Sequence, residues 1–315
     1  MTRDELVEAA RLSIRRGSAS FRAASRLFDR STRERVWMLY AWCRACDDLA
    51  DAQDHGGALG DQSGAEERLA TIRTLTERAI AGDVTGQPAF DALGQLYREV
   101  PLTSAMAEDV IAGFALDAAD WRPRTEADML RYCYHVAGAV GVMMATVMGV
   151  PASDDDTLDR ACDLGLAFQL ANIVRDVAED DAAGRCYLPA DWLADAGVPS
   201  GELIRPGYRP ALVAMVARAC ALARGYETSA RVGAARLPFR QRWAIVSAAN
   251  IYGAIGRQVE QLGAHAWDQR VRTTRTQKLG FLLSAAAEAV RPVPAGAAAA
   301  LPRPSRRELA ALARD

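Results

Sequence analysis

The chain has 315 residues, half of them hydrophobic, with 38 Lys and Arg against 40 Asp and Glu and a formal net charge of −2. This length is enough for one large domain with a substantial core. The balanced charge provides no basic excess to neutralise phosphates, which argues against nucleic acid as a main partner.

Almost every segment predicts helix, because Ala, Leu, Arg and Glu dominate and alternating β-branched runs are missing. The start of the second helix, Ser31-Thr32 with Glu34, resembles a capping box. The fold class is therefore all-α. The predicted helices cover residues 3–16, 31–51, 65–81, 87–99, 102–120, 125–149, 153–181, 190–195, 209–233, 238–264 and 273–290.

The connections between these helices contain turn residues. Residues 18–21 are predicted as a small polar turn, and residues 53–64 as a Gly-rich surface loop. No domain linker is visible in the sequence. We therefore predict one domain over residues 1–290, followed by a Pro/Ala-rich tail over residues 291–315.

One uncharged segment, from Tyr132 to Val150, approaches the length of a transmembrane helix. It contains tyrosines, a histidine and several small residues, which favour a central buried helix over a membrane span. Its glycines would let a neighbouring helix or a long ligand approach the backbone closely. The residues predicted to form a cavity wall are Gly138, Val142, Ala145 and Met148.

The six cysteines include a Cys43-x-x-Cys46 pair, which invites a metal or redox interpretation. No second CxxC and no His pair completes a zinc site, so we predict reduced thiols in or near the core. Met1 is followed by charged and polar residues rather than by an apolar run. We therefore expect a cytoplasmic, reducing location.

The stretch from Leu164 to Pro189, LGLAFQLANIVRDVAEDDAAGRCYLP, predicts a helix with unusual polar positions. At 100° per residue, four polar side chains fall within an arc of roughly 80°, beside an apolar stripe rather than opposite it. Carboxylates are costly to bury without a cation, so this face requires a positive partner. The four polar residues are Gln169, Asn172, Asp176 and Asp180.

The second predicted helix repeats this pattern in VWMLYAWCRACDDLAD. Its polar side chains share an arc of roughly 60°, with Asp48 just outside it. A lone D-x-x-x-D would be read as a solvated acidic face, but both pairs here lie in apolar helices. The residues within the arc are Tyr40, Arg44, Asp47 and Asp51.

Two acidic pairs, Asp47/Asp51 and Asp176/Asp180, are suited to hard cations with oxygen ligands. Mg²⁺ fits best when phosphates complete its coordination, because it takes only one or two carboxylates per ion. Two such helices facing a cavity could clamp a diphosphate. Guanidinium groups could bind the phosphate oxygens directly, and the candidates are Arg44, Arg175 and Arg185.

With these residues the chain resembles the squalene/phytoene synthase family. Three blocks carry the resemblance: YAWCRACDDLAD, YCYHVAGAVGVMMATVMGV and LGLAFQLANIVRDVAEDDAAGRCYLP. The likeness extends from about residue 10 to residue 290 and leaves the tail outside. It implies a helical bundle of the isoprenoid-synthase type around a central cavity.

The resemblance also implies roles for individual residues. The implied metal-binding residues are Asp47, Asp48 and Asp51 in the first block and Asn172, Asp176 and Asp180 in the third. The four paired aspartates and Tyr252, expected near the reacting carbons, are the implied catalytic residues. The implied substrate contacts are Ser18, Ser20, Phe21, Tyr40, Arg44, Gln169, Asn172, Arg175, Arg185 and Tyr187. The family often has a basic or bulky residue where this sequence has Gly17.

The implied reaction joins two prenyl diphosphates head to head, with Mg²⁺, or Mn²⁺ in its place, as the metal. Blocks such as WCRACDD and RYCYHVAGAVG look most like bacterial phytoene synthases. The expected substrates are then two geranylgeranyl diphosphates, which pass through prephytoene diphosphate to phytoene and release diphosphate. No NADPH is expected for that product.

Two alternatives stay open. A squalene or dehydrosqualene synthase would use two farnesyl diphosphates, and a non-catalytic relative would act as an assembly or binding protein. Head-to-tail prenyltransferases and terpene cyclases also use paired acidic helices, but the third block argues against both. The remaining expectations are prenyl diphosphates as partners, peripheral contact with the inner membrane surface, and a monomer or weak homo-oligomer.

Overall fold

The computed structural model describes residues 1–17, 19–53, 63–292 and 304–311. None of these residues forms a β-strand, which confirms the predicted all-α class. The α-helices are α1 (Arg3–Arg16), α2 (Ala19–Ser25), α3 (Arg30–Ala50), α4 (Ala65–Ala81), α5 (Pro88–Glu99), α6 (Ser104–Ala118), α7 (Glu126–Cys133), α8 (Ala139–Val147), α9 (Asp155–Ala182), α10 (Ala190–Asp195), α11 (Arg209–Ala234), α12 (Phe239–Leu262), α13 (Arg275–Ala289) and α14 (Arg306–Ala311). Shorter turns are the π-helix η1 (Tyr134–Gly138) and the 3₁₀ helices η2 (Pro206–Tyr208) and η3 (Gly263–His265).

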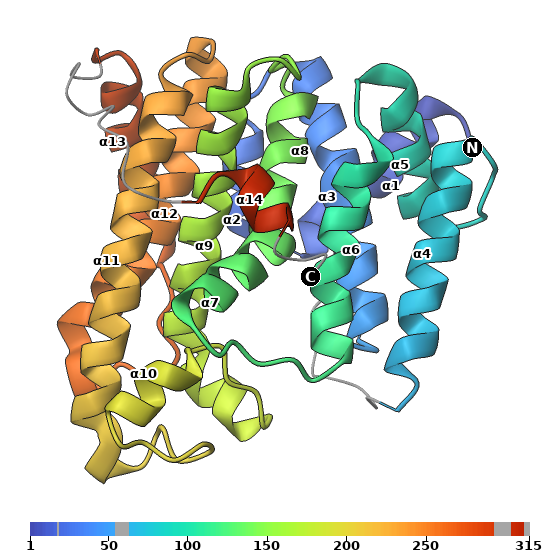
Figure 1. The fold of residues 1–315 in the computed structure, drawn as a ribbon. Helices are drawn as coiled ribbons and strands as arrows, with labels where there is room; N and C mark the ends of the chain where they lie inside the picture. Colours follow the sequence, from blue (N-terminus) through green and yellow to red (C-terminus); the bar gives the residue numbers. More distant parts are fainter. Residues whose placement is uncertain (18, 54–62, 293–303, 312–315) are drawn as a thin grey trace.

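The helix α9 runs through the middle of the bundle (Figure 1). On one side it packs against α11 and α12, and on the other against η1 and α8. The helix α13 covers the outer side of α12, and the N-terminal helices α1 and α3–α6 form the opposite half. The helix with the polar stripe is therefore central.

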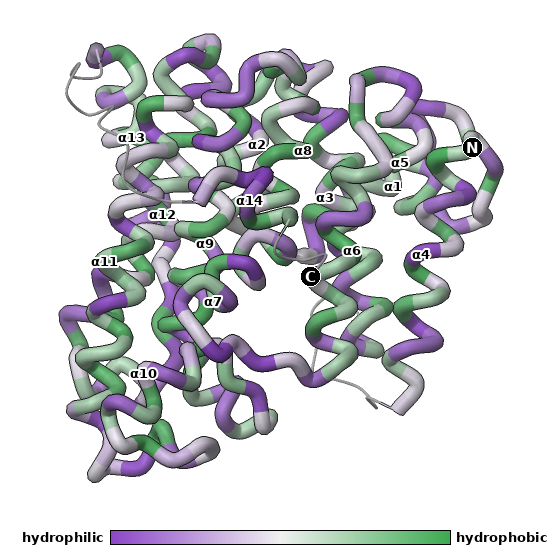
Figure 2. The backbone as a smooth tube through the Cα atoms, in the orientation of Figure 1, coloured by the Kyte–Doolittle hydropathy of each residue, from purple (hydrophilic) through white to green (hydrophobic). Residues whose placement is uncertain are grey.

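Large apolar side chains from both halves meet in one core. Trp42, Phe90, Met143 and Leu166 are fully buried, although they come from four different helices. Hydrophobic and hydrophilic residues alternate along the helices in Figure 2, as expected for amphipathic helices packed around a common interior. Burial of these faces supplies most of the favourable free energy of folding.

Two predictions at the N-terminal end are wrong in detail. The helix α3 begins at Arg30, one residue before the predicted start, and the Asp29 carboxylate caps it by accepting a hydrogen bond from the Thr32 N–H at 3.0 Å. The predicted polar turn at residues 18–21 belongs largely to the helix α2. Packing against α12, and a stack of Phe21 on Tyr40 at 5.3 Å, stabilise a helix that sequence propensity did not predict.

The predicted helix over residues 125–149 is divided by the π-helix η1 between α7 and α8. This segment crosses α9 at very close range: a Cβ added at Gly165 would lie 2.3 Å from the Ala137 carbonyl oxygen. A Cβ at Gly141 would lie 2.4 Å from the Ala161 carbonyl oxygen. The expected close approach of a helix to these glycines is thus confirmed at Gly141.

The C-terminal tail contains a helix that the sequence did not predict. In α14, Leu309 is buried, and Arg306 donates to the Asp155 carboxylate at 2.5 Å and also pairs with Asp159. Arg307 pairs with Asp155 at 2.8 Å. These ion pairs tie α14 to the start of α9, and the helix also contacts η1 and α7. The division of the chain at residue 290 stays a prediction.

Within the part of the chain that the structure describes, no helix is both long enough and apolar enough to span a membrane. The uncharged segment is instead part of the core, since Tyr132, Tyr134, His135 and Met143 are all at most 5% exposed. This confirms the prediction of a central buried helix.

Candidate active site

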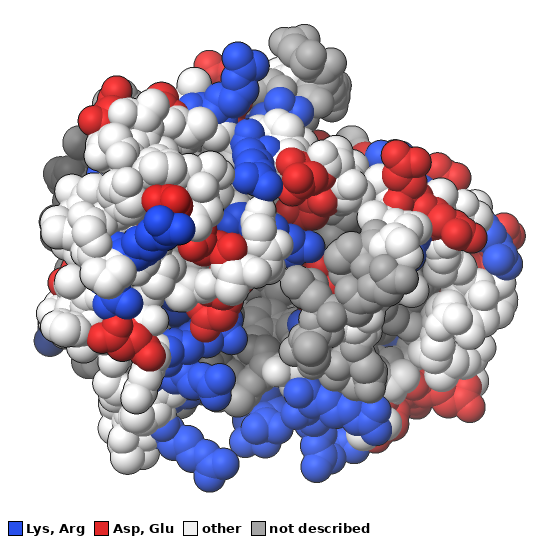
Figure 3. Space-filling view, turned by 90° about the horizontal axis from the view of Figure 1, so that it is seen from below, with Lys and Arg blue, Asp and Glu red and all other residues white. Residues whose placement is uncertain are grey.

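The two pairs of aspartates, Asp47/Asp51 and Asp176/Asp180, face one polar pocket of about 600 Å³. The pocket lies at the C-terminal ends of both helices, at the lower end of the molecule in Figure 1. Seen from below, Lys and Arg side chains border a hollow on this face (Figure 3). The predicted site residues that line the pocket are Arg44, Asp47, Asp51, Gln169, Asn172, Arg175, Asp176, Asp180, Arg185 and Tyr187.

On α3, helical spacing places Asp47 and Asp51 one turn apart at the pocket, as predicted. Arg44 pairs with Asp47 at 2.9 Å and also with Asp48, whose side chain does not line the pocket. Arg185, beyond the end of α9, reaches Asp51 at 3.6 Å. Asp48 therefore pairs with Arg44 and does not line the pocket.

On α9, the two carboxylates have different partners although they lie one turn apart. Asp176 accepts a 2.6 Å hydrogen bond from Arg175 and two 2.9 Å hydrogen bonds from Arg270. For Asp180, no ion pair is found within the described residues. The acidic face therefore has one carboxylate that is already neutralised and one that is not.

This difference determines the charge state of each carboxylate. Burial alone would raise the pKa of Asp176, but the guanidinium groups of Arg175 and Arg270 outweigh it and hold that pKa below its usual value. Burial, together with the negative charge of Asp176, raises the pKa of Asp180 to about 7. Burial likewise raises the pKa of Asp47 to about 6, against the opposing effect of Arg44. Asp180 is thus the buried carboxylate that no arginine pairs with among the described residues, whereas Asp47 keeps Arg44 at 2.9 Å.

Asp117 and Tyr132 form part of the pocket that sequence reasoning missed. The Asp117 carboxylate on α6 accepts hydrogen bonds from Tyr187 at 3.0 Å and from Tyr132 at 3.2 Å, and the two tyrosine rings stack at 4.6 Å. Burial raises the pKa of Asp117 to about 6, although both hydroxyls oppose the rise. A carboxylate in the apolar run FALDAA was the available sequence signal.

Arg270 also lines the polar pocket and was not among the predicted site residues. The sequence showed a basic run from Arg270 to Lys278 without indicating which of its residues reaches the site. Arg270 lies in the segment between η3 and α13. Its guanidinium group donates a hydrogen bond to Asp176 on α9, which is 94 residues earlier in the sequence. The other basic residues of the run do not line the polar pocket.

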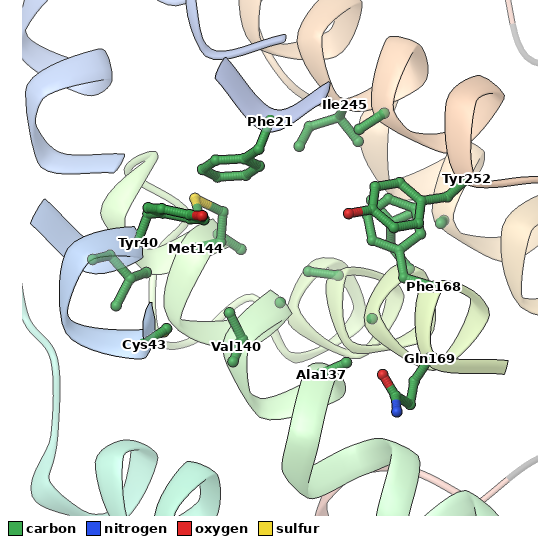
Figure 4. A pocket seen from close by; sticks show the side chains of 18 of the residues that line it. Phe21, Tyr40, Cys43, Ala137, Val140, Met144, Phe168, Gln169, Ile245 and Tyr252 are labelled. Atoms are coloured by element: carbon green, nitrogen blue, oxygen red, sulfur yellow. The ribbon is translucent and has the colours of Figure 1, made fainter. Parts of the chain in front are cut away.

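A second, mostly apolar cavity of about 490 Å³ adjoins the polar pocket. In Figure 4, Phe21 and Tyr40 lie on one side, Tyr252 stacks on Phe168 on the other, and Gln169 lies at the lower edge. The Phe168 and Tyr252 ring centroids are 4.1 Å apart. Tyr252 therefore lines the apolar cavity, while its place near the reacting carbons stays a prediction.

The two cavities share part of their lining. Arg44 and Asp47 of α3, and Gln169 and Asn172 of α9, line both. The side-chain amide of Asn172 donates a hydrogen bond to Oε1 of Gln169 at 3.3 Å, which holds the two side chains together. A ligand with a charged head and an apolar tail could pass this junction without leaving the protein.

The predicted wall residues are only partly correct. Ala145 and Met148 line the apolar cavity, whereas Gly138 and Val142 do not. A Cβ at Gly138 would meet the Cys162 sulfur at 2.9 Å, so this residue lies in the helix crossing instead. From this segment, the residues that line the cavity are Val136, Ala137, Val140, Gly141, Met144, Ala145 and Met148.

The N-terminal substrate segment is described only in part. Ser18 and the side chain of Ser20 lie outside the described residues, while Phe21 lines the apolar cavity. A Cβ added at Gly17 would lie 2.0 Å from the Tyr40 hydroxyl oxygen. The space where relatives often carry a larger residue is therefore filled by Tyr40.

The chemistry of the carboxylates can be compared with the predicted metal. Among the described residues, no three His, Cys, Asp or Glu side chains converge into a metal site of their own. The carboxylates come instead in pairs on two facing helices, and burial raises the pKa of three of the four, Asp47, Asp51 and Asp180. This arrangement fits Mg²⁺, which takes one or two carboxylates and completes its shell with water and substrate phosphates.

The six cysteines are all free thiols.

Comparisons with known proteins agree with this geometry. Residues 14–277 match the family model described as squalene/phytoene synthase. The chain is 48% identical over 276 residues to 15-cis-phytoene synthase from Enterobacter agglomerans, which covers 87% of this chain and 92% of that protein. It is 45% identical over 293 residues to phytoene synthase from Pseudescherichia vulneris, covering 92% and 94% of the two chains.

A solved dehydrosqualene synthase structure with a bound ligand superposes with a TM-score of 0.80 at 26% identity, covering 90% of this chain and 96% of that one. The predicted isoprenoid-synthase type of bundle is thereby confirmed. The extent of the family match and the identity to curated relatives allow one conclusion: the chain belongs to the squalene/phytoene synthase family.

Proposed function

We propose that this prenyltransferase-type enzyme condenses two geranylgeranyl diphosphates head to head, through prephytoene diphosphate, to phytoene and two diphosphates. The relatives with the printed names phytoene synthase and 15-cis-phytoene synthase support this substrate, because they match the chain at 45% to 48% identity over most of its length. The structure adds a second argument, based on the length of the apolar cavity along α9.

The observation that carries the proposal is one continuous face of α9. Its residues line the polar pocket at Asp176 and Asp180, and the same stripe lines the apolar cavity from Asn172 back to Thr157. These last two residues are fifteen apart, which at about 1.5 Å per residue is about 22 Å along the helix. A diphosphate at the acidic end would thus have its tail directed along this cavity.

That length favours the longer substrate. An isoprene unit adds about 5 Å to an extended chain, because it contains four carbon–carbon bonds of about 1.5 Å in a zigzag. A chain of four units is then about 20 Å long and one of three units about 15 Å. The cavity along α9 accommodates the four-unit chain of geranylgeranyl diphosphate, whereas farnesyl diphosphate would leave its far end empty.

The residues that would hold Mg²⁺ are the four paired aspartates, with Asn172 beside them. Bound Mg²⁺ would neutralise the diphosphate and so favour loss of the leaving group. The arginines now paired with Asp47, Asp51 and Asp176 would turn to the phosphate oxygens, which accept two N–H bonds from a guanidinium group. Mn²⁺ would bind the same oxygens.

The apolar cavity would protect the reacting carbons. Carbocations are quenched by water, and the wall residues offer few polar groups. The stacked pairs Phe21/Tyr40 and Phe168/Tyr252 present aromatic faces from two sides, which attract a positive charge. No residue of the cavity needs to act on NADPH for this product.

Product analysis tests the proposal. The protein is incubated with Mg²⁺ and labelled geranylgeranyl or farnesyl diphosphate, with and without NADPH, and the lipids are extracted. A C40 hydrocarbon without NADPH supports the proposal. Selective C30 product would make it a squalene or dehydrosqualene synthase, and no turnover of either substrate would favour the binding-protein alternative.

Peripheral membrane contact belongs to the same proposal, because the product is a lipid. The support is on α13, where Leu279 and Leu283 are 59% and 65% exposed beside Arg275 and Lys278. Such a face suits an anionic lipid surface. Flotation with vesicles containing anionic lipid should carry the protein upward, and Leu279→Ser with Leu283→Ser should reduce it. Equal flotation of both forms would contradict this contact.

A further inference from the structure

The far end of the apolar cavity contains a buried charged residue that the proposed reaction does not use. Arg160 on α9 is 8% exposed, yet it lines the cavity together with Thr157, Val150 and Leu237. An arginine at the end of a hydrocarbon cavity is costly unless its guanidinium group is satisfied elsewhere.

The guanidinium group is satisfied by groups on α9 and α11. Its Nε donates to the Asp156 carboxylate at 3.0 Å, and Nη1 donates to the Ser229 hydroxyl at 3.0 Å and to the Ser229 carbonyl oxygen at 3.3 Å. Asp156 is itself shared with Arg236. The charge is thereby fixed at the helix interface, and the aliphatic part of the side chain remains for the cavity.

The position of that aliphatic part depends on a glycine. A Cβ added at Gly233 on α11 would lie 2.7 Å from Arg160 Cβ and 3.3 Å from its Cδ. The arginine stem therefore lies flat across the α11 backbone, where a larger residue at position 233 would displace it. Gly233 lines the same end of the cavity.

We propose that the stem of Arg160 is the floor of the prenyl cavity and sets the longest tail that it accepts. This inference rests on the proposed function and makes it more specific. The residues near the diphosphate bind every prenyl diphosphate equally well, since the head is the same. Selection against a longer chain must come from the far end of the cavity, where Arg160 lies against Gly233.

The test compares C20 and C25 tails on variants of one residue. Arg160→Ala removes the stem, Arg160→Leu shortens it, and Arg160→Met keeps an unbranched stem without the charge. Binding of the non-ionising S-thiolodiphosphates of geranylgeraniol and geranylfarnesol is measured by calorimetry with Mg²⁺. Product chain length from the two diphosphates is measured in parallel. Asp156→Asn is the matched control, because it weakens the ion pair and leaves the stem in place.

We expect Arg160→Ala to raise the preference for the C25 over the C20 tail about tenfold, the scale by which an apolar pocket discriminates chain length. Arg160→Leu should give a preference for the C25 tail between those of Arg160→Ala and the parent protein. In Arg160→Met and Asp156→Asn this preference should stay within about twofold of the parent protein. If Arg160→Ala does not fold, the difference between the Leu and Met variants decides the question.

Two results would overturn the inference. One is an unchanged C25 to C20 ratio in folded Arg160→Ala, or in Arg160→Leu where the Ala variant does not fold. The other is a change in Arg160→Met as large as in the Ala variant, which would assign the effect to the charge. Failure of the parent protein to convert the C20 substrate is a different outcome, since it would contradict the proposed function itself.

Discussion

The two ends of the α9 face use charge in opposite ways. At the C-terminal end, Asp180 has no ion pair within the described residues, and the arginines on Asp176 are at the surface of an open pocket. At the N-terminal end, the Arg160 guanidinium group donates to the Asp156 carboxylate and to the Ser229 hydroxyl. The first arrangement leaves charges free to exchange partners, as ligand binding requires. The second keeps a charge out of an apolar cavity.

The largest expected effect comes from removing a charge at the open end. Asp176→Asn should lower metal-dependent turnover by about 10³-fold, the scale on which preorganised charges contribute to such reactions. The helical circular dichroism should not change, because the residue lies at the pocket surface. Asp181→Asn is the matched control, since this neighbouring aspartate does not line either cavity. Near-normal rates in Asp176→Asn would contradict the two-helix clamp.

The middle of the same helix depends on backbone contact rather than on charge. Gly165→Ala would place a Cβ 2.3 Å from the Ala137 carbonyl oxygen, so α9 and η1 must separate. We expect a loss of about 3 kcal/mol in unfolding free energy, at the upper end for overpacking. Gly256→Ala on α12 serves as control, because its Cβ would meet only the Cys220 sulfur, at 3.6 Å. Similar midpoints in urea for both variants would show that the crossing tolerates the methyl group.

The open end should also make stability depend on pH. The folded-state pKa of Asp180, about 7, is above the 3.8 of an unperturbed aspartate, so folded protein binds the proton more tightly. The associated stability is fully present below about pH 3.8 and is lost as pH rises through 7. Between pH 5 and 8, the metal-free protein should lose on the order of 2 kcal/mol that Asp180→Asn does not lose. Urea unfolding in EDTA measures this, and parallel profiles of the two proteins would refute it.

The smallest effect is expected beside the pocket, at Asp117. Asp117→Asn keeps the size of the side chain but weakens the acceptor for the hydroxyls of Tyr132 and Tyr187. We expect a rise in KM of about tenfold and little change in kcat, since a hydrogen bond to a charged acceptor contributes about 1.5 kcal/mol or more. Tyr132→Phe should give a smaller rise. An unchanged KM in both variants would exclude Asp117 from positioning Tyr187.

The sequence alone determined the helical class, the two acidic pairs and most residues of the candidate site. These features are local: a period of 3.6 residues fixes which side chains share a face, and Asp47/Asp51 or Asp176/Asp180 are each one turn apart. The same period places four further residues on the faces of the acidic pairs: Gln169, Asn172, Tyr40 and Arg44. Their roles in catalysis stay predictions.

Only the tertiary structure decided how these faces meet. Asp117, Tyr132 and Arg270 reach the pocket from segments whose own sequence patterns do not point to it, because contacts across 70 or 94 residues depend on how helices cross. The same crossing moved Gly138 and Val142 out of the cavity wall. It also brought Arg160 against Gly233, and it decided that the α9 residues from Thr157 to Asn172 line a cavity, which sequence periodicity cannot supply.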